Sequence, residues 1–424
     1  LKYSKMPNVY SERNLVYLYG FIILLLFPAL FFNLGIYPLN LDEATRAVVT
    51  LEMKFSGNLL SPSINGGFYL NKPPLFNWIQ LFFVNLTGST EEWVFRLPAV
   101  LSLLGFGLTV FITLAKEVNR KVGFFTALAI ITSFRLLLYD SFKGLIDISF
   151  SWIIYLNFWT IYHNFRKERY FRLFIFSWIL TLLGFMLKGL PAIVFQGISL
   201  LVYFSYCKSL RKLFSLHHLS GILIFSFFAL GYLFLYSKES SLVQYLTNLW
   251  NESAKRTPID NPFSDTLLHL FVFPVDFIYN FLPWSLFVVF LFSKYSISKI
   301  KSEKFLIFLV LVFFSNIVIY WISPAIYPRY LFMFLPSFYA VLSYAYFNTG
   351  DSSPIQRYFF NPLFISIPVL FPIAICILPF IFESELYSHF WLKIVSLGST
   401  ALVLAFLFYK FKNERIFIIL AFAL

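Results

Sequence analysis

The sequence contains little charge and little cysteine. Only 12% of its 424 residues are Asp, Glu, Lys or Arg, whereas a soluble domain carries about 25%. This shortage excludes an ordinary cytosolic enzyme and a disordered chain, because both rely on charged side chains at their surface. Two cysteines, Cys207 and Cys376, are too few for a disulfide framework or a thiolate metal site.

The chain is instead rich in apolar residues: 59% are hydrophobic and 22% are Phe, Trp or Tyr. A helix needs roughly 20 apolar residues to cross the hydrocarbon core of a bilayer, so we predict an all-α polytopic membrane protein with about 12–13 transmembrane helices. A short apolar stretch from Ile416 to Leu424 resembles the start of the last of these. The longer apolar runs fall near residues 14–36, 97–115, 122–139, 147–163, 171–187, 190–206, 219–236, 268–293, 305–322, 330–347, 359–381 and 390–409.

The positions of Lys and Arg orient these spans. If the N-terminus is cytoplasmic and the spans alternate, most of the 33 basic residues fall in cytoplasmic segments, as the positive-inside rule requires. The positive-inside rule then accounts for the net charge of +13, so this charge does not indicate a nucleic-acid partner, and we expect none. Two long loops lie outside, residues 37–96 and 237–267, and loops of this length usually carry function. We expect residues 1–424 to form a single transmembrane domain, with the fewest motifs in residues 341–424.

The first outer loop opens with two adjacent acids, Asp42 and Glu43. Apolar residues recur at three- and four-residue spacing over residues 42–56, which predicts a short amphipathic helix. Asp42 then stands at the N-cap and Glu43 in the first turn, and one interpretation is that the pair serves only as caps. Alternatively, a carboxylate at the membrane edge can act as a general base that takes a proton from an attacking hydroxyl.

Lys72 precedes a second amphipathic helix in the same loop. Turn-forming residues 57–67 separate the two helices, and the Pro73-Pro74 pair suits a first helical turn. A lysine beside the free N–H groups of a helix start makes a natural phosphate site. The alternative is a lysine that only extends its ammonium to the membrane surface.

The order of these motifs resembles the first periplasmic loop of the GT-C glycosyltransferases, most closely the ArnT-like and protein O-mannosyltransferase-like enzymes. The resemblance implies a GT-C fold and a polyprenyl-phosphate-linked sugar donor, and it covers residues 10–340. No nucleotide-binding glycine motif or P-loop is present, which also favours a lipid-borne donor. The motifs are D-E-x-x-R at 42–46, G-x-x-x-x-P-x-x-N-G at 57–66, Y-x-x-K-P-P-L at 69–75 and W-x-x-R-L-P at 93–98.

Further matches lie in the later outer loops. Asp147 fits the family's second acid best, with Asp140 as the alternative, and Lys188 lies in a K-G-x-P turn. All of these charges fall at the outer ends of spans, where ionisable groups are costly and usually functional. We therefore expect them to share one cavity. The expected catalytic residues are Asp42, Glu43 and Asp147; the phosphate-binding residues are Lys72, Lys188, Arg256 and Arg329; the other substrate-binding residues are Arg46, Tyr69, Asn71, Glu252 and Tyr330.

The resemblance breaks at Asn71. Enzymes of the ArnT-like group commonly carry Glu there, which can help to hold a metal, whereas Asn is a neutral and poorer ligand. We therefore predict no metal site and no required cofactor, and leave a divalent cation as the alternative.

The sequence thus predicts an inverting glycosyltransferase in a bacterial inner membrane, with a cytoplasmic N-terminus and a periplasmic active site. It would move a sugar from a polyprenyl-phosphate donor to a lipid, glycan or protein acceptor. Two alternatives stay open: a transporter or flippase of lipid-linked glycans, or a non-catalytic subunit of the same fold. A transporter would place ionisable groups deep within its spans, whereas here they lie at span ends.

Overall fold

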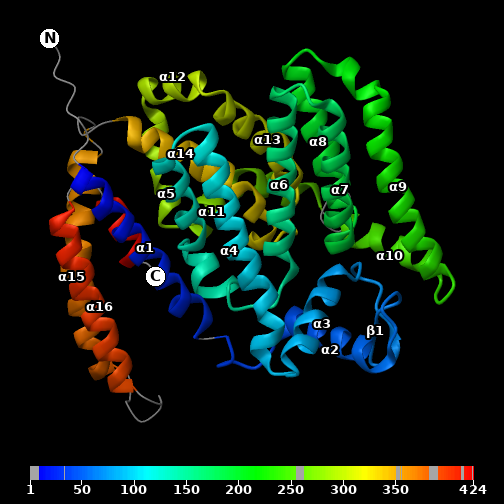
Figure 1. The fold of residues 1–424 in the computed structure, drawn as a ribbon, viewed down its shortest axis with the longest axis horizontal. Coiled ribbons are helices and arrows are strands. Elements are labelled where there is room, and N and C mark those ends of the chain that lie inside the picture. The colour runs from blue at the N-terminus through cyan, green and yellow to red at the C-terminus, as the bar shows by residue number, and fades with distance from the viewer. Residues whose placement is uncertain are drawn as a thin grey trace. The chain divides into compact units, whose positions relative to one another are not determined.

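The computed structural model describes residues 9–32, 34–254, 262–349, 354, 356–381, 390–411, 415–422 and 424. Helices dominate these residues, as Figure 1 shows, which confirms the predicted all-α class. The chain divides into two compact units, one of residues 34–348 and one of residues 1–33 with 349–424. Nothing tests the expectation of a single domain, which stays a prediction.

The larger unit begins with two short helices that lie side by side, α2 (Leu41–Ser56) and α3 (Leu75–Thr87) (Figure 1). They are the two amphipathic helices predicted for the first outer loop. A hairpin of β1 (Ser63–Ile64) and β2 (Gly67–Phe68) joins them, with Ser63 paired to Phe68. Asn65 and Gly66, at its turn, both have positive φ, as the common two-residue hairpin turn requires.

Local sequence explains the ends of both helices. The N-cap of α2 is Asn40, not Asp42 as predicted, and Asp42 and Glu43 occupy the first turn. Acids there favour the helix because they face its unpaired N–H groups. Gly57 and Gly88 end α2 and α3 in the left-handed conformation, at φ values of 71° and 67°, which glycine adopts without steric cost.

The rest of the larger unit is a bundle in which α6 packs against α4 and α7, α7 against α9, and α8 against α13. In Figure 1, α6, α7 and α8 stand next to one another. The bundle consists of α4 (Glu92–Glu117), α5 (Arg120–Ile131), the π-helix η1 (Leu136–Asp140), α6 (Ile146–Arg166), α7 (Tyr170–Lys188), α8 (Pro191–Tyr206), η2 (Leu210–Phe214), α9 (Leu216–Ser237), α10 (Leu242–Ala254), α11 (Phe263–Asn280), η4 (Trp284–Phe292), α12 (Lys294–Ser302), α13 (Lys304–Trp321), η5 (Pro328–Phe334) and α14 (Leu335–Thr349).

The smaller unit contains α1 (Val9–Phe31) and the C-terminal helices. Within it, α15 packs against α16, and α17 packs against both, while the rings of Tyr19 and Phe417 meet edge to face at 5.3 Å. The C-terminal helices are η6 (Gln356–Phe360), α15 (Asn361–Ile381), α16 (Phe390–Lys410) and α17 (Arg415–Phe422).

Seven helices of the described residues are long and apolar enough to span a membrane, or eight if one bent pair counts as a single span. The protein is therefore a multi-pass membrane protein. Two predicted runs are not single straight spans. The run 122–139 breaks after Ile131, because α5 is only 12 residues long, or about 18 Å, and η1 follows. The run 268–293 bends by 120° between α11 and η4.

Close packing of α4 on α5 depends on Gly123. A Cβ built there lies 2.8 Å from the Phe111 carbonyl oxygen and 2.9 Å from the Ala115 nitrogen, both backbone atoms that cannot rotate away. We predict that Gly123→Ala lowers the free energy of unfolding by about 1–3 kcal/mol through overpacking. Thermal unfolding in detergent measures this. Gly197→Ala is the matched control, because no atom lies within 4 Å of its Cβ position, and an equal loss there would contradict the packing argument.

Candidate functional site

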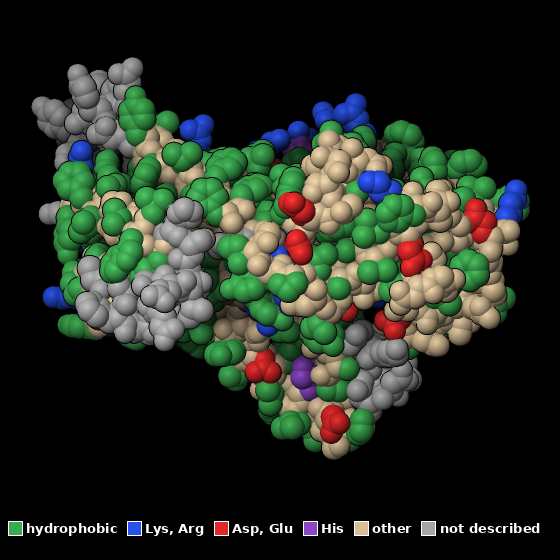
Figure 2. Space-filling model, turned by 90° about the horizontal axis from the view of Figure 1, so that it is seen from below, with side chains coloured by type: hydrophobic (Ala, Val, Ile, Leu, Met, Phe, Trp, Pro, Cys, Tyr) green, Lys and Arg blue, Asp and Glu red, His purple; other side chains and the backbone are tan. Residues whose placement is uncertain are grey.

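Charged side chains from six separate segments of the larger unit line one cavity of about 220 Å³. The segments are the start of α2, the loop before α3, the start of α6, the end of α7, α10 and the start of η5. The lining residues are Asp42, Thr45, Arg46, Tyr69, Asn71, Lys72, Leu145, Ile146, Asp147, Lys188, Glu252, Tyr327, Arg329 and Tyr330. Figure 2 views the end of the molecule that carries α2 and α3, where acidic side chains are scattered among hydrophobic ones.

Ion pairs connect four of these side chains in a row. Arg329 Nη2 lies 2.5 Å from Asp42 Oδ2, and Arg329 Nε lies 3.4 Å from Asp147 Oδ2. The other oxygen of Asp147 accepts a hydrogen bond of 2.5 Å from Lys188 Nζ. Asp42 is the accessible end of this row, since its side chain is 64% exposed while that of Asp147 is 10% exposed. Asp147 therefore holds two cations in place, and Asp42 is the carboxylate that a ligand can reach.

Lys72 faces the same cavity from the loop before α3, with its Nζ 3.9 Å from Glu252 Oε2 of α10. Burial lowers the pKa of Lys72 to about 8, and the nearby Lys188 ammonium adds to the effect, while Glu252 opposes it. A buried ammonium among other cations gains from any anion that enters the cavity, since the anion replaces lost hydration.

Aromatic and amide groups complete the wall. The guanidinium of Arg46 lies 5.2 Å from the centre of the Tyr69 ring, and Lys188 Nζ lies 3.9 Å from that of Tyr330. Burial raises the pKa of Tyr69, so its hydroxyl stays protonated and can donate at neutral pH. Asn71 accepts a hydrogen bond of 3.0 Å from the Asn248 side chain, which joins this loop to α10.

The cavity has four cationic and three acidic side chains among its described lining residues: Arg46, Lys72, Lys188 and Arg329 against Asp42, Asp147 and Glu252. Such a site can bind an anion with charge-assisted hydrogen bonds and still present a free carboxylate oxygen.

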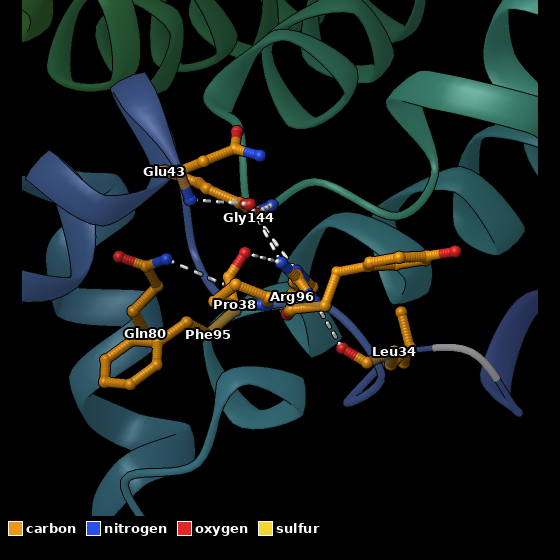
Figure 3. Close-up of polar contacts among 9 residues, drawn as sticks. Leu34, Pro38, Glu43, Gln80, Phe95, Arg96 and Gly144 are labelled. Atoms are coloured by element: carbon orange, nitrogen blue, oxygen red, sulfur yellow. Dashed lines mark hydrogen bonds and ion pairs between the residues drawn. The ribbon is translucent and has the colours of Figure 1, made fainter. Parts of the chain in front are cut away.

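Glu43 does not line this cavity, contrary to the expectation of a catalytic role beside Asp42. Its carboxylate is 2% exposed and accepts hydrogen bonds from Arg96 Nε at 3.1 Å, Arg96 Nη2 at 2.8 Å, the Gly144 backbone N–H at 3.0 Å and the Asn40 backbone N–H at 3.2 Å. Figure 3 shows these contacts converging. Arg96 also donates to the carbonyl oxygens of Leu34, Tyr37 and Pro38. The Glu43 carboxylate therefore joins the starts of α2 and α6 to α4, and its predicted catalytic role stays a prediction.

The turn at Gly144 is held tightly against α4. A Cβ built on Gly144 would lie 2.7 Å from the Phe95 carbonyl oxygen, which itself accepts a hydrogen bond of 2.9 Å from Gln80. Figure 3 shows Gln80, Phe95 and Gly144 around the ion pair. The turn precedes Leu145 to Asp147, so the same contacts fix the start of α6.

Sequence reasoning named most of the lining but not all of it. Of the twelve predicted site residues, ten line the cavity, Glu43 lies behind it, and Arg256 falls outside the described residues. Asp140, the alternative to Asp147, pairs with Arg135 at 2.6 Å and does not line this cavity. Four lining residues were not predicted, Thr45, Leu145, Ile146 and Tyr327, and neither was the contact of Glu43 with Gly144. Only spacing along α2 could have indicated Thr45, which lies three residues after Asp42 and so on the same face of the helix.

No group of three or more His, Cys, Asp or Glu that could hold a metal occurs among the residues the structure describes. The absence of a metal site stays a prediction.

Comparisons with known proteins bear on this arrangement. The model of the dolichyl-phosphate-mannose-protein mannosyltransferase family matches residues 71–232. An uncharacterized protein of Aquifex aeolicus (strain VF5) is 24% identical over 342 residues, which cover 79% of this chain and 65% of that protein. The undecaprenyl phosphate-alpha-4-amino-4-deoxy-L-arabinose arabinosyl transferase of Shewanella sediminis (strain HAW-EB3) is 29% identical over 113 residues, 25% of this chain and 20% of that enzyme. The matched parts thus span less than two thirds of these relatives.

Two crystal structures share the fold. ArnT from Cupriavidus metallidurans bound to undecaprenyl phosphate gives a TM-score of 0.68 at 17% identity, over 96% of this chain and 74% of that one. The apo state of the same protein gives 0.66 at 16% identity, over 97% and 74%. These matches confirm the predicted GT-C fold of the ArnT-like kind.

The buried pair between Glu43 and Arg96 should be measurable as stability. We predict that Glu43→Gln lowers the free energy of unfolding by about 3–5 kcal/mol, because it leaves the Arg96 guanidinium buried without its counter-charge. Thermal unfolding in detergent measures the loss. Glu92→Gln, at a partly exposed acid in the first turn of α4, should change stability by less than about 1 kcal/mol. Equal effects of both substitutions would contradict the assignment.

Proposed function

We propose that this ArnT-like protein of GT-C fold is a membrane glycosyltransferase that takes its sugar from a polyprenyl-phosphate donor. The observation that supports this most directly is the convergence of Lys72, Lys188 and Arg329 with the accessible carboxylate of Asp42 in one cavity. The names of the relatives, a polyprenyl-phosphate-dependent arabinosyl transferase and a dolichyl-phosphate-mannose-dependent family, agree with it.

The cations would bind the donor phosphate. Of Lys72, Lys188 and Arg329, Lys72 is the least compensated, since its ion pair with Glu252 spans 3.9 Å and its pKa is already lowered to about 8. Lys188 and Arg329 share the buried Asp147, so they are held in position before a ligand arrives. Preorganised cations of this kind stabilise the charge that grows on the leaving phosphate.

Asp42 would act as the general base. It takes the proton from an acceptor hydroxyl, the hydroxyl oxygen forms a bond to the anomeric carbon, and the bond from that carbon to the phosphate oxygen breaks. The electron pair leaves with the polyprenyl phosphate, next to Lys72. A single displacement of this kind inverts the configuration at the anomeric carbon. Arg329 keeps the Asp42 carboxylate oriented until then, through their 2.5 Å contact.

Other residues of the cavity would hold the sugar. Arg46, Tyr69, Asn71, Glu252 and Tyr330 offer donors, acceptors and ring faces around the space between Asp42 and Lys72. We place the reaction on the periplasmic side of a bacterial inner membrane, on the charge distribution of the loops. The acceptor is a lipid, a glycan or a protein.

Asp42→Asn is the decisive substitution. We predict that this variant inserts and folds but loses sugar transfer by about 10²–10⁴-fold, because the amide cannot accept the proton. Transfer from a radiolabelled undecaprenyl-phosphate sugar to envelope extracts measures it, with Asp276→Asn, outside the cavity, as the control. Full transfer by Asp42→Asn, or lipid movement across proteoliposomes without any glycosyl product, would overturn the proposed function.

The pKa of Lys72 predicts a pH dependence of donor binding. The ammonium is charged below about pH 8 and attracts phosphate only in that form, so the affinity for undecaprenyl phosphate should fall as pH rises through this value. Titrations between pH 6.5 and 9.5 measure the affinity. Lys72→Gln should bind more weakly throughout and show a flatter profile, and an unchanged profile would exclude Lys72 as the phosphate ligand.

A further inference from the structure

A second cavity of about 230 Å³ adjoins the first in the larger unit. Its lining residues are Asn40, Leu41, Asp42, Glu43, Arg135, Tyr139, Lys143, Leu145, Tyr327 and Arg329. Asp42, Leu145, Tyr327 and Arg329 line both cavities. The Asp42–Arg329 ion pair therefore stands in a common wall, and the same carboxylate is accessible from two sides.

The second cavity contains one cation without a counter-charge. Arg329 pairs with Asp42, Arg135 with Asp140 at 2.6 Å, and Glu43 with Arg96 at 2.8 Å. Lys143 forms no ion pair with any acid in the described part of the chain, and its Nζ lies 3.8 Å from the centre of the Tyr139 ring. A cation on an aromatic face keeps its charge available to a ligand.

The backbone fixes Lys143 close to Asp42. The N–H of Gly144, the next residue, donates to Glu43, which directly follows Asp42. Tyr139 and Arg135 come from η1 and the residue before it, and the Arg135 guanidinium lies 4.8 Å from the centre of the Tyr139 ring. Single π-helical turns are rare and frequently occur at functional sites. The half-exposed ring of Tyr139 therefore has two cations, Arg135 and Lys143, within contact distance.

We propose that the second cavity binds the acceptor, and that the acceptor carries an anionic group, phosphate or carboxylate, which Lys143 contacts while its hydroxyl reaches Asp42. This rests on the proposed function, because it assigns the first cavity to the donor. The acceptor hydroxyl then approaches the anomeric carbon of the donor on the side opposite the leaving phosphate, as a single displacement needs. Asp42 takes the hydroxyl proton, the hydroxyl oxygen bonds to the anomeric carbon, and the bond from that carbon to the donor phosphate oxygen breaks, so that the lipid phosphate leaves beside Lys72.

This arrangement requires the Arg329 side chain to move when the donor binds. Its guanidinium contacts both Asp42 and Asp147, so donor phosphate in the first cavity competes for it and frees an oxygen of Asp42. Asp42 Oδ2, which Arg329 contacts in this structure, then becomes available as a proton acceptor. The arrangement favours binding of the donor before the acceptor reacts.

The test is a titration of the full chain, purified in nanodiscs and saturated with undecaprenyl phosphate so that the first cavity is occupied. The probes are glucose 1-phosphate, glucuronate and neutral methyl glucoside. We expect an anionic probe to bind more tightly than methyl glucoside. Lys143→Gln should weaken that binding about tenfold, the loss of one charge-assisted contact, and Lys143→Arg should restore most of it. Lys167→Gln, an exposed lysine outside both cavities, is the control.

The outcomes separate the two proposals. If undecaprenyl phosphate binds and depends on Lys72, but the anionic probes bind no better than methyl glucoside or ignore Lys143→Gln, the acceptor assignment is wrong and the donor assignment stands. If undecaprenyl phosphate does not bind to the wild-type protein, the proposed function fails first. A response to glucose 1-phosphate but not glucuronate identifies phosphate as the recognised group, and the reverse identifies carboxylate.

Discussion

The Glu43 carboxylate is the contact on which the site depends. It is buried, and it accepts hydrogen bonds from three segments that are far apart in sequence: the Asn40 N–H before α2, the Arg96 guanidinium of α4 and the Gly144 N–H before α6. Desolvating a carboxylate and a guanidinium is costly. Here the cost is offset because Arg96 also satisfies three carbonyl oxygens of residues 34–38. These contacts therefore fix the start of α2, which carries Asp42.

The contacts of Glu43 also explain why Asp42 faces two cavities. Asp42 precedes Glu43 in the first turn of α2 and points away from the buried pair, while the turn at Gly144 brings Lys143 and Asp147 to its two sides. Arg329, which enters from η5, then closes the space between the cavities. Neighbouring acids thus have opposite tasks: Glu43 organises backbone segments, and Asp42 remains exposed to ligands.

The cations of the two cavities differ in how closely an acidic side chain pairs with them. Lys188 and Arg329 share Asp147 at 2.5 and 3.4 Å and are largely buried, whereas Lys72 has Glu252 only at 3.9 Å. Lys143, in the second cavity, has an aromatic ring and no acid among the described residues. Well-paired cations fix the geometry, and poorly paired ones have the most to gain from an incoming anion, because a buried charge without a partner is unfavourable. The first cavity thus holds two poorly paired cations, Lys72 and Arg46, which contacts the Tyr69 ring, and the second holds one, Lys143.

The amino-acid sequence determined the membrane class, the two amphipathic helices and most of the cavity lining. These follow from local rules: the lengths of apolar runs, helical spacing over residues 42–56, glycine at the helix ends and ordered motifs in the first loop. Motifs order residues along the chain but not in depth, so both Asp42 and Glu43 were predicted to be catalytic. Only the tertiary structure separated them, because the burial of Glu43 depends on Arg96 and Gly144, 53 and 101 residues away. The breaks after Ile131 and at α11 were likewise decided by packing, since hydropathy measures the length of an apolar run and not its straightness.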